Sequence, residues 1–309
     1  YSNTLMVGRT QLCHALPITY GFKISAWIEN FIDIKEQFFE IEKRLFRLRF
    51  GGAVGGFHSF HPHGENLINA LADRLELRIG IVHGRSSPES FLEYLSKLTL
   101  IGQTVGKIVN ELYFLTSTEI SEIREYLPDS VVGSSTMPHK INPKNLIKLR
   151  SKSNKLRQLL SGVVSFQNPL NEGDASSNNE ISSMIHSICP LALNILFKFS
   201  DILNAVVPDK VRMKENVLNT QEFTSSEAIQ MHLAKYLGRG KAHDLINDLI
   251  KVSEKNDQSF IELLNTDPEV SKYINKNKLN ELISAANNIG DCQGIAERAG
   301  KFGLSKSSL

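Results

Sequence analysis

The sequence predicts an all-α protein: an elongated bundle of long helices followed by a small helical C-terminal domain. Two observations predict this class. Apolar residues recur in alternating steps of three and four through four long segments, and no segment has a strand-rich pattern. Such long apolar seams cannot be buried by one helix alone, so the helices must pack together. Shorter helical patterns with Asn- and Lys-rich links follow, which places a boundary between a bundle domain, 1–220, and a C-terminal domain, 221–309.

The four long segments begin and end at recognisable signals. Gly51-Gly52 is expected to end the first, Ser87-Pro88 opens the second, and Asn142-Pro143 opens the third. Pro190 is expected to kink the fourth, because it removes one backbone donor. The predicted long helices cover roughly 20–48, 87–112, 143–163 and 181–206, and the short ones 64–77, 225–236, 241–255, 258–264 and 291–301.

Composition excludes several classes of function. The chain has 309 residues and a net charge of only +2, which gives no electrostatic case for binding nucleic acid. Its three cysteines lack CxxC spacing, which suits a reducing cytoplasm. No apolar run is expected to reach the length of a membrane span.

Two clusters are typical of cofactor or metal sites but fit them poorly. The glycines of 51–56 follow a helix, whereas the dinucleotide fingerprint follows a strand. His58, His61 and His63 have only Glu65 near them at ligand spacing. The sequence therefore favours a tight turn and a polar loop here, with no metal and no cofactor.

The segment Gly133 to Pro143 carries the clearest chemical signal. It has no helical period, and Asn142-Pro143 is typical of an N-cap followed by a first helical residue. A helix N-terminus presents free N–H groups and positive potential, and Lys140 adds a full charge. This combination predicts a site for a carboxylate or phosphate, with Ser134 or Ser135 placed to act on it.

The literal string Gly-Ser-Ser-Thr-Met-Pro-His-Lys-Ile-Asn-Pro resembles the signature loop GSSxMPxKxNP of the fumarase/aspartase superfamily at every fixed position. That superfamily includes argininosuccinate and adenylosuccinate lyases and 3-carboxy-cis,cis-muconate cycloisomerase. Gly8-Arg9-Thr10-Gln11 with His14 to Pro17 resembles a second shared region, and segments after residue 200 are most similar to the cycloisomerase branch. Relatives usually carry a further N-terminal domain, so the chain resembles their second and third domains.

The resemblance implies cofactor-free chemistry on a small polycarboxylate. A base removes a proton next to a carboxylate, and an acid assists departure of the group on the adjacent carbon. By this resemblance Ser134 is the candidate base, with Ser135 as the alternative, and Lys140 and Asn142 hold a substrate carboxylate. The remaining residues that it assigns to substrate binding are Arg9, Thr10, Gln11, Met137, Asn171 and Glu172.

Two departures from the superfamily pattern stand out. Gln11 occupies a position where many lyases have His, and glutamine cannot exchange a proton near neutral pH. Asn171-Glu172-Gly173 stands where relatives typically begin His-Glu-Arg, which removes an imidazole and an anion-binding guanidinium. The segment is equally compatible with a pocket wall and with a solvated loop. His14 is a further candidate for the missing acid.

Three functions remain open from the sequence. The first is a cycloisomerase-like enzyme acting on a di- or tricarboxylate, and the second is a fumarate-releasing lyase of the adenylosuccinate or argininosuccinate type. The third is a catalytically inactive helical homologue, which Gln11 and Asn171 motivate. Relatives build each active site from three subunits, so the resemblance implies a cytoplasmic homotetramer with shared active sites and no membrane or nucleic-acid partner.

Overall fold

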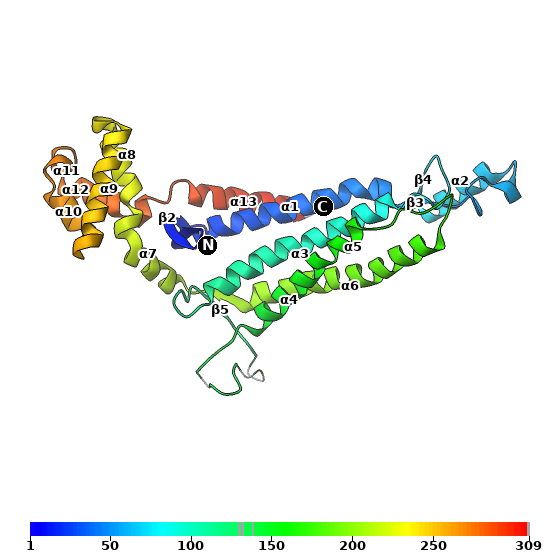
Figure 1. Cartoon of the computed structure of the whole chain (residues 1–309), viewed down its shortest axis with the longest axis horizontal. Helices are drawn as coiled ribbons and strands as arrows, with labels where there is room; N and C mark the ends of the chain where they lie inside the picture. Colours follow the sequence, from blue (N-terminus) through cyan, green and yellow to red (C-terminus); the bar gives the residue numbers. More distant parts are fainter. Residues whose placement is uncertain (129–130, 132, 138, 308–309) are drawn as a thin grey trace. The chain divides into compact units, whose positions relative to one another are not determined.

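A computed structural model describes residues 1–128, 131, 133–137 and 139–307 (Figure 1). The described chain is predominantly helical, as the sequence predicts. Its long helices are α1 Tyr20–Leu45, α3 Glu89–Leu115, α4 Lys144–Gln158 and α6 Ala175–Ala205. Its shorter helices are α2 Gly64–Leu75, α5 Leu160–Val164, α7 Lys210–Thr224, α8 Ser226–Leu237, α9 Arg239–Asn256, α10 Phe260–Thr266, α11 Pro268–Tyr273, α12 Lys276–Ile283 and α13 Cys292–Ser307. The strands are β1 Leu5–Thr10, β2 Cys13–Thr19, β3 Arg47–Leu48, β4 Arg78–Ile79, β5 Ile123–Glu125 and β6 Val206–Pro208, and two 3-10 turns cover His58–Phe60 and Ala285–Asn287.

The chain divides into two compact units that are not continuous in sequence. The first contains Tyr1–Glu29, Ser117–Arg124 and Pro208–Leu309, and the second contains Asn30–Thr116 and Glu125–Val207. The predicted boundary near residue 220 does not coincide with this division, because α7 packs on β1 and β2 at the start of the chain. Sequence order alone could not show that the N-terminal residues join the C-terminal helices.

The second unit is the helical bundle. Helices α3, α4 and α6 pack on one another, and each buries the apolar seam that the sequence predicts (Figure 1). A Cβ atom on Gly102 would lie 3.0 Å from Leu156, and one on Gly106 would lie 3.4 Å from Ser153, so α3 and α4 run antiparallel. The rings of Phe31 and Phe199 stack at 5.5 Å between centroids. The part of α1 from Asn30 onward therefore joins the same bundle.

The first unit combines a β-hairpin with a cluster of short helices. Strands β1 and β2 pair antiparallel, from Leu5 opposite Thr19 to Thr10 opposite Cys13. Helices α8 to α12 share a core around Ile229, Leu233 and Phe260. The Glu222 carboxylate accepts hydrogen bonds from the Ser259 hydroxyl and the Ile261 N–H, which fastens α7 to α10.

Local capping explains where many of these helices begin. Asp174, Asp209 and Ser259 each accept a hydrogen bond from a backbone N–H in the first turn of α6, α7 and α10. Asp267 does the same for α11, whose first residue is Pro268. These short polar side chains fix where each helix begins, because they accept hydrogen bonds from N–H groups that the first turn of a helix leaves unpaired.

Several sequence-based expectations differ from the structure. The hairpin at 5–19 is a strand-rich segment that the helical pattern concealed, since two six- to seven-residue strands are too short to dominate a periodicity. Helix α1 ends at Leu45, before Gly51-Gly52, because β3 follows at once and pairs with β4. Helix α6 already begins at Ala175, because Asp174 caps it. It continues through Pro190.

Helix α6 also differs from the expectation about membranes. By length and composition alone, it is the one helix in the described part of the chain that is long and apolar enough to span a membrane. The expectation that no apolar run reaches this length is therefore wrong. One such helix is weak evidence, and α6 packs its inward stripe against α3 and α4.

Candidate active site

The signature loop, defined here as 133–143, is folded back on itself. The Asn142 side-chain amide donates a hydrogen bond to the Gly133 carbonyl at 3.1 Å, and the Lys140 N–H donates one to the Met137 carbonyl at 2.9 Å. A Cβ atom on Gly133 would lie 2.9 Å from the Lys140 carbonyl oxygen, so this closure requires glycine. Pro138 lies outside the described residues.

Ser134 is the hydroxyl that the loop surrounds with donors. Its Oγ accepts hydrogen bonds from the backbone N–H groups of Met137 at 3.2 Å and Thr136 at 3.4 Å. Two N–H dipoles directed at one oxygen stabilise negative charge on it. Ser134 is half-buried, whereas Ser135 is exposed. The geometry therefore separates two serines that the sequence could not.

The start of helix α4 differs from the sequence prediction. The N-cap position is Pro143, not Asn142, and it makes no side-chain cap bond. Instead the buried carboxylate of Glu125 accepts hydrogen bonds from the N–H groups of Asn145 at 3.0 Å and Leu146 at 3.1 Å. The expectation that this helix start offers its free N–H groups to a ligand is therefore wrong for these two donors. A carboxylate of the protein already accepts their hydrogen bonds.

The other predicted loop residues face outward. Lys140 is exposed, and among the described residues its side chain has no ion-pair or hydrogen-bond partner. Met137 is 41% exposed. An exposed ammonium group on a loop that also carries Ser134 is suited to holding a carboxylate close to that serine.

Thr10 and Gln11 lie at the tip of the β1–β2 hairpin in the first unit. Gln11 and Leu12 have φ angles of 52° and 67°, so both adopt the left-handed conformation of a two-residue turn. Asn and Gly usually fill such positions, and Leu12 fills one with its side chain 75% exposed. Backbone strain of this kind is tolerated where neighbouring structure enforces it and is frequent at functional sites.

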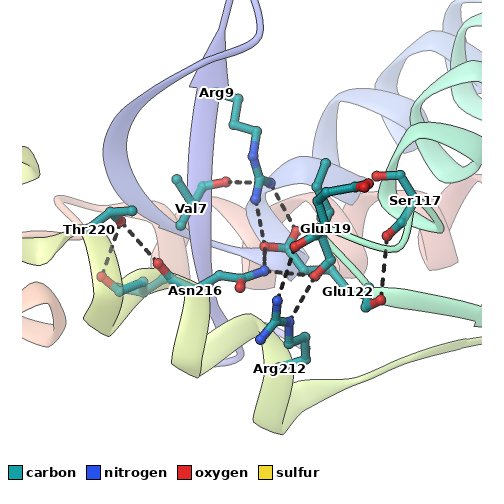
Figure 2. A network of polar contacts seen from close by, with 11 residues as sticks. Val7, Arg9, Ser117, Glu119, Glu122, Arg212, Asn216 and Thr220 are labelled. Carbon is teal, nitrogen blue, oxygen red and sulfur yellow. Dashed lines mark hydrogen bonds and ion pairs between the residues drawn. The ribbon is translucent and has the colours of Figure 1, made fainter.

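Arg9 is committed to a buried ion pair. Its two terminal nitrogens lie 2.9 and 2.7 Å from the two carboxylate oxygens of Glu122, whose side chain is fully buried (Figure 2). The side-chain amide of Asn216, on α7, donates a further hydrogen bond to Glu122 at 2.9 Å. Arg212 donates to the carbonyls of Glu119 and Ile120. The predicted substrate-binding Arg9 thus anchors the hairpin to the 117–124 segment.

His14 follows the hairpin turn, close to this ion pair. Burial, and secondarily the positive charge of Arg9, lower the pKa of His14 below its ordinary value, while Glu122 opposes the shift. The lowered pKa favours the neutral form of the imidazole. A neutral imidazole can accept a proton but is a weak proton donor.

Asn171 and Glu172 line a cavity of about 390 Å³ in the second unit. Asn171 has a positive φ of 56°, which turns the chain just before Asp174 caps α6. Arg85, from the loop before α3, lines the same cavity. Arg85 carries no sequence signal for this position, because nothing in its local pattern links it to residue 171. Tertiary packing thus places the guanidinium of Arg85 in the same cavity lining as segment 171–173, which has no arginine of its own.

The signature loop and this cavity are not brought together within the second unit. Because α4 runs antiparallel to α3, the loop lies at the end of α3 near Leu115, whereas residues 171–174 follow α5 at the other end. Among the described residues, no group of three or more His, Cys, Asp or Glu side chains is arranged to hold a metal ion.

Comparison with known families decides the identity of the fold. A family model described as "Lyase" matches residues 1–157, and one described as "Adenylosuccinate lyase C-terminus" matches residues 222–299. The chain belongs to the fumarase/aspartase superfamily of lyases. Both its signature loop and its hairpin lie inside the first match.

Individual superfamily relatives differ in the reaction for which they are named. An N-acetyl-S-(2-succino)cysteine lyase of Enterococcus italicus is 32% identical over 85% of this chain and 58% of its own length. A 3-carboxy-cis,cis-muconate cycloisomerase of Acinetobacter baylyi is 28% identical over 95% of this chain and 65% of its own. An adenylosuccinate lyase of Pyrococcus abyssi is 29% identical over 96% and 66%. The chain thus spans about three fifths to two thirds of the length of these relatives.

A solved superfamily structure has the same fold. The 3-carboxy-cis,cis-muconate lactonizing enzyme from Pseudomonas putida superposes with a TM-score of 0.88 at 26% identity, covering 99% of this chain and 68% of that one. A class II fumarase from Schistosoma mansoni has the same fold, with a TM-score of 0.75, although it is only 17% identical in sequence.

Proposed function

We propose that the protein is a cofactor-free acid/base lyase or cycloisomerase that acts on a small di- or tricarboxylate. The observation that carries this proposal is the environment of Ser134, whose Oγ receives two loop N–H groups. A serine becomes an effective base only when its alkoxide is stabilised. These two N–H groups already point at the Ser134 oxygen, so they supply that stabilisation without having to reorganise during the reaction. Ser134 removes the proton next to a substrate carboxylate.

Lys140 anchors the carboxylate of the substrate. Its ammonium group is exposed and without a partner in the described chain. Asn142 closes the loop through the Gly133 carbonyl, which leaves its side-chain oxygen for the ligand or solvent. Ser135 and Met137 form the outer wall of this site. Charge on Lys140 also stabilises the dianion that proton removal creates.

The hairpin tip contributes Thr10 and Gln11 as hydrogen-bonding groups. Arg9 holds the tip in place through its ion pair with Glu122, and its assignment to substrate binding stays a prediction. Gln11 donates a hydrogen bond but cannot deliver a proton near neutral pH. The departing group is therefore assisted by a residue other than Gln11.

A homotetramer with shared active sites is part of this proposal. Ser134 and Asn171 lie at opposite ends of the α4–α5 segment, so a site that contains both draws on more than one copy of the chain. We place this assembly in the cytoplasm. Size-exclusion chromatography with light scattering tests it, and a monomer that turns over substrate would contradict it.

Replacement of Ser134 tests the proposed base. Ser134→Ala is expected to reduce kcat by about 10²–10⁴-fold while leaving the circular dichroism spectrum and Tm unchanged. Ser135→Ala is the matched control, since it removes an exposed hydroxyl one residue away, and it is expected to retain most activity. Retained turnover in Ser134→Ala would remove this assignment.

A second candidate function is favoured by a specific observation. The relative named for lyase action on N-acetyl-S-(2-succino)cysteine is 32% identical, which is higher than the 28% of the A. baylyi cycloisomerase. Release of fumarate from succinyl adducts, followed by ultraviolet absorbance, distinguishes this reaction from lactone isomerisation. If neither the succinyl adducts nor the substrates of the cycloisomerase reaction raise Tm or turn over, the chain is the catalytically inactive homologue.

A further inference from the structure

A second concave site, lined by basic residues, lies in the bundle unit. The cavity has a volume of about 480 Å³ and is lined by Lys43 at the end of α1, Arg47 on β3, Arg49 after it and Arg78 on β4. No carboxylate is among the described residues that line it. Because α3 and α4 run antiparallel, this cavity and the signature loop lie at opposite ends of α3, a helix about 40 Å long.

Two of these cations belong to residues that are paired in register on β3 and β4. The strands pair parallel with Arg47 opposite Arg78. Like charges directly opposite one another on paired strands destabilise a sheet. Across the described chain, the side chains of Lys43, Arg47 and Arg78 form no ion pair or hydrogen bond, although Arg44 close by is paired with Glu93. Within the described residues, neither arginine of this pair therefore has a counter-charge in direct contact.

Arg49 adds a third guanidinium in a less solvated position. Its guanidinium carbon lies 5.5 Å from the centre of the Phe91 ring. Burial, and to a smaller extent the charge of Arg47, lower the pKa of Arg49 against the opposing charge of Glu89. An arginine remains charged regardless, so this position is one where a bound anion gains most.

We propose that this cavity binds a small phosphate-bearing polyanion through Arg47, Arg49 and Arg78, with Lys43 at its rim. Guanidinium groups bind phosphate oxygens through paired, charge-assisted hydrogen bonds, and three of them match a ligand with at least two negative charges. The volume is that of a small-molecule site, and Leu48, Ile79 and Val82 supply an apolar wall beside the charges. Anion binding relieves the repulsion between the two opposed arginines.

The test compares the full chain with Arg47→Gln/Arg78→Gln. Tripolyphosphate is expected to raise the Tm of the wild-type protein by about 5 °C at saturating concentration, and by less than about 1 °C in the double variant. Isothermal titration is expected to show a loss of affinity of about tenfold or more. The double variant without ligand should be at least as stable as the wild type, because it loses a repulsive pair; a large fall in Tm would mean that the arginines are structural and would overturn the proposal.

A control variant and three further probes distinguish the alternatives. Arg74→Gln/Arg239→Gln removes the same charge from exposed positions outside the cavity lining, and it should respond to tripolyphosphate as the wild type does. Citrate binding more tightly than tripolyphosphate would overturn the assignment to phosphate. Binding of an RNA oligonucleotide or of anionic vesicles, with no response to tripolyphosphate, would show that the surface serves a macromolecule and would overturn the small-ligand proposal.

Discussion

Glu125 Oε1 accepts a hydrogen bond from the backbone N–H of Asn145 at 3.0 Å, and its second oxygen accepts one from Leu146. The same carboxylate therefore closes the segment that contains the signature loop. It also places a negative charge at the positive end of α4, which is favourable. The loop is tied at its base by a residue outside the motif that identifies it.

Glu125→Ala is expected to lower the free energy of unfolding by about 2 kcal/mol, because a helix cap and its charge are lost together. Glu125→Gln keeps one acceptor and should cost about half as much. Urea denaturation measures both. Because the loop is expected to lose order from the wild type to Glu125→Gln to Glu125→Ala, activity should fall in that same order. The effect on kcat should be larger than the effect on KM.

The exposed Glu254→Ala is the control for this pair of variants, with an expected change within about 0.5 kcal/mol. Equal stability of Glu125→Ala and Glu254→Ala would show that the cap contributes nothing.

Arg9→Ala is expected to destabilise the protein by about 3–5 kcal/mol, since it leaves the fully buried Glu122 charge without its partner. Thr10→Val, one residue away at the exposed tip, should leave stability nearly unchanged and weaken substrate binding. Thermal unfolding and KM measured side by side distinguish the two. An Arg9→Ala protein of unaltered Tm but raised KM would restore Arg9 to the ligand site.

Leu12→Gly is expected to stabilise the hairpin by up to about 1 kcal/mol, because glycine adopts φ near 67° without the Cβ penalty. The gain is limited by the greater freedom of glycine in the unfolded chain. Leu12→Ala is the matched control, since alanine retains the Cβ atom and should give no gain. Guanidinium denaturation measures the three proteins, and equal gains from both substitutions would assign the effect to loss of the exposed side chain.

His14 should make the protein less stable as the pH falls. Its folded-state pKa is lowered from 6.5, so below that pH the unfolded chain binds the proton more readily than the folded one. The stabilising contribution is complete above pH 6.5 and is lost as the pH falls through the folded-state value. The Tm of the wild type should therefore drop more between pH 7.5 and 5.5 than that of His14→Gln, and parallel pH profiles would contradict this.

The sequence by itself determined the helical seams and the signature loop. The residues along α3 that the periodicity places inward, from Leu95 to Leu112, are buried, because helical periodicity is a local property of the backbone. The loop motif likewise identified the superfamily, since its spacing is written in consecutive residues. The hairpin at 5–19 was missed because short strands next to a long helix leave little periodic signal.

Only the tertiary structure decided which charged groups pair and which do not. It pairs Arg9 with Glu122, places Glu125 at the start of α4, and sets Arg47 opposite Arg78 with no ion-pair partner for either among the described residues. It also separates Ser134, which accepts two N–H groups, from its neighbour Ser135. Each of these relationships depends on which segments pack against one another in the folded chain. The stability of a charge or the basicity of a hydroxyl is set by the groups around it in space, which the neighbouring residues in sequence do not reveal.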